Sequence, residues 1–108
     1  MTRDWPALQE SLMRHQDADG LTNLGLALEQ HAEASQANLQ QARLCFQGAL
    51  RYYSRDYTPE EWANTQDYLG RVTLKLAVQA QGEERVDLLE AALDATRAAL
   101  RQKSALSS

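Results

Sequence analysis

The sequence is poor in residues that crosslink a chain or interrupt a helix. Its 108 residues include a single cysteine, so no disulfide can form within the chain, and a reducing, cytoplasmic setting is expected. Two prolines and five glycines leave few places where a helix must stop. The N-terminal segment lacks the apolar core of a signal peptide, and no apolar run approaches the ~20 residues of a membrane span. We therefore expect no membrane partner.

Clustered positive charge is also missing. The 11 lysines and arginines are spread singly along a chain with 15 acidic residues, and the formal net charge is −4. A nucleic-acid-binding surface gathers its cations so that they can contact phosphates. The charge pattern thus disfavours a nucleic-acid partner.

Groups that could carry catalysis are few and isolated. His15 and His31 do not have the spacing of metal ligands. Cys45 has apolar neighbours and is expected to pack as a small apolar residue. The acid pairs Glu60-Glu61 and Glu83-Glu84 fall in first turns of predicted helices, where the helix dipole explains them. We predict no catalytic, cofactor-binding or metal-binding residue and no enzymatic activity.

A strong helical pattern runs through the whole chain. Hydrophobic residues make up 44 % and charged residues 24 %, a globular balance dominated by good helix formers. No stretch alternates apolar and polar residues for long enough to be a strand. The sequence predicts one all-α domain, 1–108, with five helices at about 4–15, 21–33, 36–56, 59–79 and 83–103 and a frayed tail at 104–108.

Four signals set the predicted helix boundaries. The polar segment 16–20 separates the first two helices, and Ser35 can cap the third. Thr58-Pro59-Glu60-Glu61 has the pattern of a capping box, in which the hydroxyl of Thr58 accepts from the backbone NH of Glu61. Gly82 separates the last two helices.

Apolar residues recur at spacings of three and four, which places them on one face of each predicted helix. The first three inward faces are predicted to be Trp5, Leu8 and Leu12; Leu21, Leu24, Leu28 and Ala32; and Leu39, Ala42, Phe46, Ala49, Leu50 and Tyr53. The last two are predicted to be Trp62, Thr65 or Gln66, Leu69, Val72 and Leu76; and Val86, Leu89, Leu93 with Ala92, Thr96 and Leu100. Tyr53 and Trp62 are expected to join the two halves of the chain.

The chain contains an internal repeat of a helix pair. Leu24-Gly25 is matched by Leu69-Gly70, 45 residues later. The segment 39–50 is matched by the segment 89–100, with an offset of 50. Two helix pairs with the same internal pattern indicate a repeat architecture.

This pattern resembles the tetratricopeptide repeat, and in particular the long-helix variety of bacterial repeat arrays. That family has a Leu-Gly pair in the first helix of each unit and small residues with an aromatic in the second. The resemblance gives units at 18–56 and 57–103, with the helix at 4–15 as a cap. Thr96 stands where the first unit has the aromatic Phe46, and both units exceed the family's period of about 34 residues. The alternative is a helical bundle in which the Leu-Gly matches are accidental.

The resemblance implies a non-catalytic adaptor or scaffold that binds a segment of another protein. In that family the first helices of the units line a concave groove. Here they would expose Thr22, Leu26, Glu29, Asn64, Asp67, Arg71 and Lys75. Such a set could recognise a peptide, or it could be an ordinary solvated face. Alanine at Arg71 and Lys75 is expected to weaken partner capture without unfolding the protein.

Two other surfaces are candidates for contact with a partner. An aromatic patch could form from Tyr52, Tyr57 and Tyr68, since Tyr is enriched at interface hot spots. Two repeats are also fewer than a repeat protein normally needs. A face of the last helix with Leu88, Ala95 and Ala99 is therefore expected to pair with a second copy in a homodimer. The alternative function is a self-associating structural module, or a regulatory subunit without a ligand groove of its own.

Overall fold

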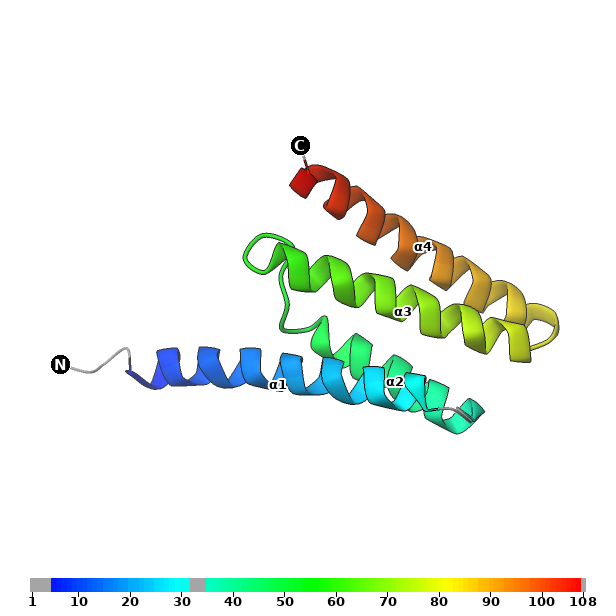
Figure 1. Ribbon diagram of the computed structural model, residues 1–108, viewed down its shortest axis with the longest axis horizontal. Helices are drawn as coiled ribbons and strands as arrows, with labels where there is room; N and C mark the ends of the chain where they lie inside the picture. Colours follow the sequence, from blue (N-terminus) through cyan, green and yellow to red (C-terminus); the bar gives the residue numbers. More distant parts are fainter. Residues whose placement is uncertain (1–4, 32–34, 108) are drawn as a thin grey trace.

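The computed structural model describes residues 5–31 and 35–107, with side chains from Gln16 onward, and this part of the chain consists of helices joined by loops, with no strand. The helices are α1 (Trp5–Gln30), α2 (Gln36–Ala49), α3 (Pro59–Gln79) and α4 (Gly82–Ser107) (Figure 1). The all-α class is confirmed. The count of five was wrong because the first two predicted helices are one. The predicted cap contacts of Trp5, Leu8 and Leu12 lie outside the described side chains, as does Ala32.

A hydrogen bond within α1 and contacts with α2 and the loop after it hold the segment that was expected to break the helix. Ala18 is fully buried, and its carbonyl accepts a hydrogen bond of 2.9 Å from Oγ1 of Thr22. The next residue, Asp19, accepts a hydrogen bond from the hydroxyl of Tyr53. Gly20 costs about 1 kcal/mol in the middle of a helix, a penalty that these contacts offset.

The other boundaries agree with the sequence in part. Oγ of Ser35 accepts from the backbone NH of Asn38 at 3.2 Å, so the predicted cap of α2 is confirmed. The helix α2 ends at Ala49 rather than at 56, and a loop follows it. The segment 104–107, predicted to fray, continues α4 to Ser107. Gly82, with φ of 63°, begins α4 as expected.

The predicted start of α3 is correct, but the capping box is not formed. Oγ1 of Thr58 instead accepts from the backbone NH of Ser54 at 2.6 Å and donates to its carbonyl at 3.1 Å. The backbone NH of Thr58 also donates to the carbonyl of Ser54, at 2.8 Å. The hydroxyl therefore closes the loop between α2 and α3 and is not available to cap α3.

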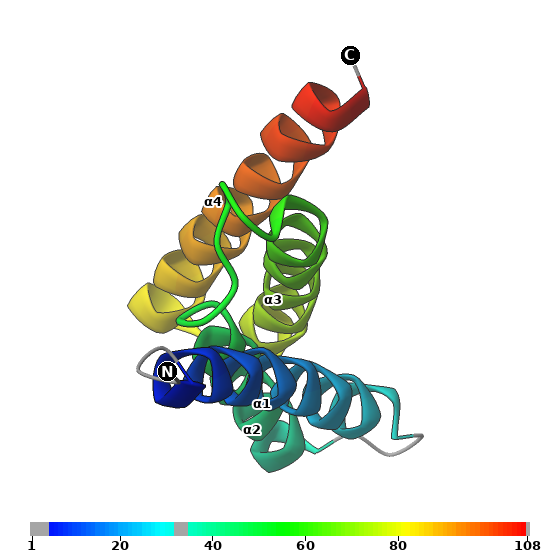
Figure 2. The same ribbon diagram turned by 90° about the vertical axis from the view of Figure 1, so that its left-hand side faces the viewer.

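Each helix packs mainly against its neighbours in the sequence, so that α1 meets α2, α2 meets α3 and α3 meets α4. In Figure 1, α4 lies on the far side of α3 from α1, and the turned view of Figure 2 shows α3 and α4 side by side. The central core joins the two helix pairs and consists of Leu39, Ala42, Phe46, Val72 and Leu76. The inward faces predicted for α2 and α3 are thus confirmed in the main, whereas Leu24 of α1 is 53 % exposed.

Within each helix pair, a glycine of the first helix lies against a side chain of the second helix at an equivalent position. A Cβ atom added to Gly25 would lie 2.7 Å from Cε1 of Phe46, and one added to Gly70 would lie 2.6 Å from Oγ1 of Thr96. The two glycines are 45 residues apart, and Phe46 and Thr96 are 50 apart, which are the offsets of the sequence repeat. The internal repeat is therefore also a repeat of helix packing.

Candidate functional site

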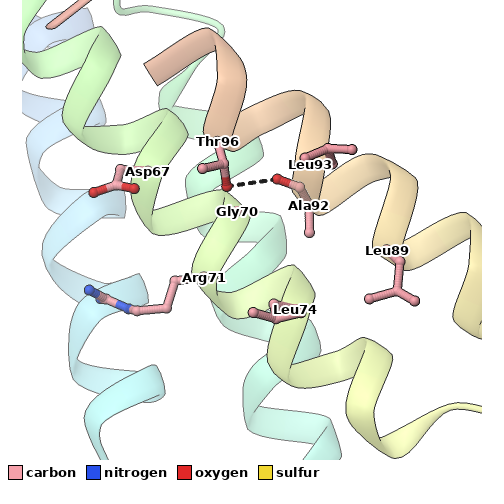
Figure 3. Close-up of a pocket in the computed structure, with 8 residues that line it drawn as sticks. All are labelled: Asp67, Gly70, Arg71, Leu74, Leu89, Ala92, Leu93 and Thr96. Carbon is pink, nitrogen blue, oxygen red and sulfur yellow. Dashed lines mark hydrogen bonds between the residues drawn. The ribbon is translucent and has the colours of Figure 1, made fainter. Parts of the chain in front are cut away.

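An open groove runs between α3 and α4. Its volume is about 590 Å³. Residues from both helices line it (Figure 3): Asp67, Gly70, Arg71, Leu74, Leu89, Ala92, Leu93 and Thr96. Its floor is made of small residues, because Gly70 and Ala92 present no large side chain there. Oγ1 of Thr96 is held by the carbonyl of Ala92, at 2.8 Å. The site is therefore a hollow between two closely packed helices.

Large apolar side chains flank this floor and are half open to solvent. Leu74 of α3 is 49 % exposed, and Leu89 and Leu93 of α4 are 43 % and 48 % exposed. The apolar surface continues along both helices, through residues that are more exposed still. We use the name α3–α4 face for Leu74, Val78, Val86, Leu89, Leu93 and Leu100. Single exposed apolar residues are common, but a contiguous apolar surface marks an interaction site.

The inward face of α4 agrees with the predicted one at Ala92, which is buried, and in part at Thr96, which is half-buried. The leucines at 89, 93 and 100, expected in the core, lie on the α3–α4 face. The residues that pack against α3 are instead small: Ala92, Ala95 and Ala99 are buried, and Leu88 is half-buried against the core. Alanines let two helices approach closely, as Gly70 also does. The surface of Leu88, Ala95 and Ala99 predicted to pair with a second copy is therefore already covered.

The residues predicted to line a concave groove are mostly engaged within the fold. Thr22 and Glu29, expected to be exposed, are buried, and Leu26 is half-buried against the core. Asp67 forms an ion pair of 3.3 Å with Lys103. Asn64, Arg71 and Lys75 of the set are exposed residues of α3.

Glu29 ties the two helix pairs together through two cations of α3. The guanidinium of Arg71 donates two hydrogen bonds to its carboxylate, and Nζ of Lys75 lies 3.1 Å from Oε2. Burial alone would raise the pKa of Glu29, but the hydrogen bonds and charges of Arg71 and Lys75 hold this pKa below its usual value. Alanine at Arg71 and Lys75 will thus affect stability, which makes it an unsuitable test of partner capture.

The three tyrosines predicted as a patch differ in their exposure. Tyr57 is 89 % exposed in the loop after α2, and Tyr52 is 38 % exposed. Tyr68 is half-buried against the core, with its ring 5.7 Å from that of Phe46 and 5.3 Å from the guanidinium of Arg71. Tyr68 therefore belongs to the packing between the helix pairs.

Tyr53 and Trp62 join the two halves of the chain as predicted. Tyr53 is buried in a cluster with Ala18 and Ala49, and Trp62 packs against this cluster. Burial, together with the hydrogen bond to Asp19, raises the pKa of Tyr53 to about 12. The fold therefore favours the neutral phenol.

This pKa makes the fold sensitive to alkaline pH. The contribution of Tyr53 to stability is complete below its unfolded pKa near 10 and is lost as the pH rises towards about 12. We expect the free energy of unfolding to fall by about 2 kcal/mol across this window. The Tyr53→Phe variant will lose this part of the pH dependence. Urea unfolding at a series of alkaline pH values measures the free energy of unfolding of the wild type and of Tyr53→Phe. If the two free energies fall in parallel with rising pH, the prediction is contradicted.

The groove offers apolar contact surface rather than reactive groups. The buried thiol of Cys45 has a pKa raised by burial and packs in the interior. Within residues 5–31 and 35–107, no three His, Cys, Asp or Glu side chains gather to hold a metal ion. In the same ranges, no helix has the length and apolar character to cross a membrane. Searches against protein-family models, curated proteins and solved structures found no match to this chain.

Proposed function

We propose that the chain is a non-catalytic protein–protein interaction module that binds a helical segment in the α3–α4 groove. One observation carries the proposal: half-exposed leucines of two adjacent helices flank a floor of glycine, alanine and threonine. A groove of this form suits the apolar side of an amphipathic helix, whose anchor residues recur at spacings of three and four. The module acts as an adaptor or scaffold.

We also propose that the module is a divergent tetratricopeptide-like pair of units. The packing of each helix against its neighbours in the sequence supports this, as do the equivalent close approaches at Gly25 and Gly70. The single buried cysteine suits a reducing, cytoplasmic setting.

The proposal predicts that a charge in the groove abolishes binding. Leu93→Glu places a carboxylate in the middle of the apolar surface, and we expect it to reduce partner capture by roughly tenfold or more. Leu44→Glu is the matched control, because Leu44 is 59 % exposed on α2 and lies outside the groove. Capture from the native cell, with quantitative mass spectrometry, compares the variants with the wild type.

Both substitutions replace exposed leucines, so the helical circular dichroism spectrum of each variant should remain close to that of the wild type. If Leu93→Glu and Leu44→Glu capture the same proteins in the same amounts, the groove is not the binding surface.

A further inference from the structure

The first helix pair is α1 and α2, and the second is α3 and α4. The surface of the first pair that is equivalent to the α3–α4 groove is covered by α3. With the repeat offset of 50, Leu89, Ala92 and Thr96 correspond to Leu39, Ala42 and Phe46. These last three form the core against α3, whereas the first three line the open groove. The surface is thus built as a docking site for a helix, and its counterpart in this chain holds one.

The offset of 45 leads to the same conclusion for a position on α3, which is open in the second pair and covered in the first. Leu74 in the groove corresponds to Glu29 of α1. Glu29 is covered by α3, which supplies Arg71 and Lys75 to it. Leu74 is 49 % exposed, because no further helix of the described part of the chain lies on α3 and α4 at this place. A leucine in place of the glutamate makes the open surface apolar.

Head-to-tail stacking of copies does not fill this surface well. In that arrangement, α1 of the next copy would dock as α3 does. The residues Asn23, Ala27 and His31 would then take the places of Tyr68, Val72 and Leu76, with the offset of 45. Leu24 takes the place of Leu69, and it is the one large apolar side chain among these four counterparts, whereas α3 fills the first pair with Tyr68, Leu69, Val72 and Leu76.

The helix α4 has an apolar face that can pack against the groove of a second copy. Val86, Leu89, Leu93 and Leu100 follow one another at spacings of three, four and seven, which places them on one side of the helix. All four are at least 43 % exposed. A helix with this stripe can lie with its leucines on the leucines of an identical helix.

The charges of α4 are divided between its two ends. The half before Ala95 holds five acidic residues and one arginine, whereas the half from Ala95 onward holds two arginines and one lysine and no acid. Two such helices repel each other when parallel and attract each other when antiparallel. Glu90 and Arg97 lie three residues before and four residues after Leu93, on the same edge of the stripe.

We infer that the occupant of the groove is a second copy of this chain, whose α4 lies antiparallel to the first across a two-fold axis near Leu93. Val86 of each copy then lies near Leu100 of the other, and Glu90 near Arg97 of the other. The pairing is isologous, so it closes as a dimer. The inference rests on the proposed function, namely that this groove binds a helix.

Sedimentation equilibrium tests the dimer. The wild type and Leu44→Glu are expected to be dimeric at micromolar concentrations, and Leu93→Glu, which sets two carboxylates together at the axis, is expected to be monomeric. A wild type that stays monomeric at hundreds of micromolar would overturn the inference. A dimer that Leu93→Glu leaves intact would overturn it as well.

Charge reversal tests the antiparallel register. Glu90→Lys alone should weaken the dimer by about tenfold, because each new lysine faces Arg97 of the second copy. Arg97→Glu alone should do the same. The double variant Glu90→Lys with Arg97→Glu restores opposite charges across the interface and should recover most of the affinity. Additive losses in the double variant would reject this register.

Disulfide trapping tests the orientation directly. In a Cys45→Ala background, Leu93→Cys should form a disulfide-linked dimer on mild oxidation, and Leu44→Cys should not. A mixture of the Val86→Cys and Leu100→Cys proteins should form the mixed disulfide in preference to either symmetric one. Predominant symmetric links would show a parallel pairing and reject the inference.

These results separate the two proposals. If the wild type is monomeric and Leu93→Glu still abolishes capture of another protein, the second copy is not the occupant, but the groove still binds a protein segment. If Leu93→Glu changes neither the oligomeric state nor capture, both proposals fail.

Discussion

Replacing Phe46 by threonine is expected to lower the free energy of unfolding by about 4 kcal/mol. The ring is fully buried where α2 meets α1 and α3, and its loss leaves a cavity between Gly25, Val72 and Leu76. The new hydroxyl would add the cost of burying a polar group. Urea unfolding followed by circular dichroism measures the change, and a loss below about 1 kcal/mol would show that the site collapses onto the smaller residue.

The reverse substitution in the second helix pair is the matched control. Thr96 occupies the equivalent position, but it is half-buried beside the open groove. Thr96→Phe is expected to change stability by only about 1 kcal/mol, because the ring can lie over Gly70 as Phe46 lies over Gly25. It should also fill the groove and reduce binding there. The two equivalent positions are thus expected to have a structural role in the first unit and, under the proposed function, a binding role in the second.

Several helix boundaries can be predicted from the sequence because the residues that determine them are close together in the chain. The cap at Ser35, the start at Pro59 and the positive φ of Gly82 depend on residues within one turn. The break expected before Leu21 did not occur, since Ala18 and its neighbours are held by contacts with α2 and the loop after it. A run of polar residues in the sequence does not reveal these tertiary contacts.

The site was harder to predict because α4 is apolar on two sides. Periodicity favours the larger residues Leu89 and Leu93 as the buried ones. The alanines at 92, 95 and 99 are buried instead, because they allow α4 to approach Gly70 closely. The repeat alignment held a usable signal, since Thr96 is too small to fill the place that Phe46 fills.

The role of Glu29 could not be predicted from α1 alone, since its partners are 42 and 46 residues away in sequence. The alignment places Arg71 and Lys75 on one side of α3, but not against α1. The tilt of one helix pair on the other decides this contact, and no local pattern encodes that tilt.

Removing both cations that face Glu29 is expected to be the second large effect. The double variant Arg71→Ala with Lys75→Ala leaves a buried carboxylate without its partners, and we expect it to cost about 3 kcal/mol at neutral pH. Both cations are roughly half exposed, which places this estimate at the lower end of the range for buried pairs. The half-exposed pair of Asp67 and Lys103 is the control, and Lys103→Ala should cost less than about 1 kcal/mol.

The pH dependence of the double variant distinguishes loss of the ion pair from simple loss of packing. In the wild type the pKa of Glu29 is lowered, so its contribution is present above the usual carboxyl value of 4.5 and is lost as the pH falls through the lower folded pKa. Without Arg71 and Lys75, burial is the remaining strong influence and raises this pKa. The variant should therefore recover stability relative to the wild type as the solution is acidified, and Glu29→Gln added to it should recover stability at neutral pH. If the stability difference is the same at every pH, Glu29 is not held as a buried anion by these two cations.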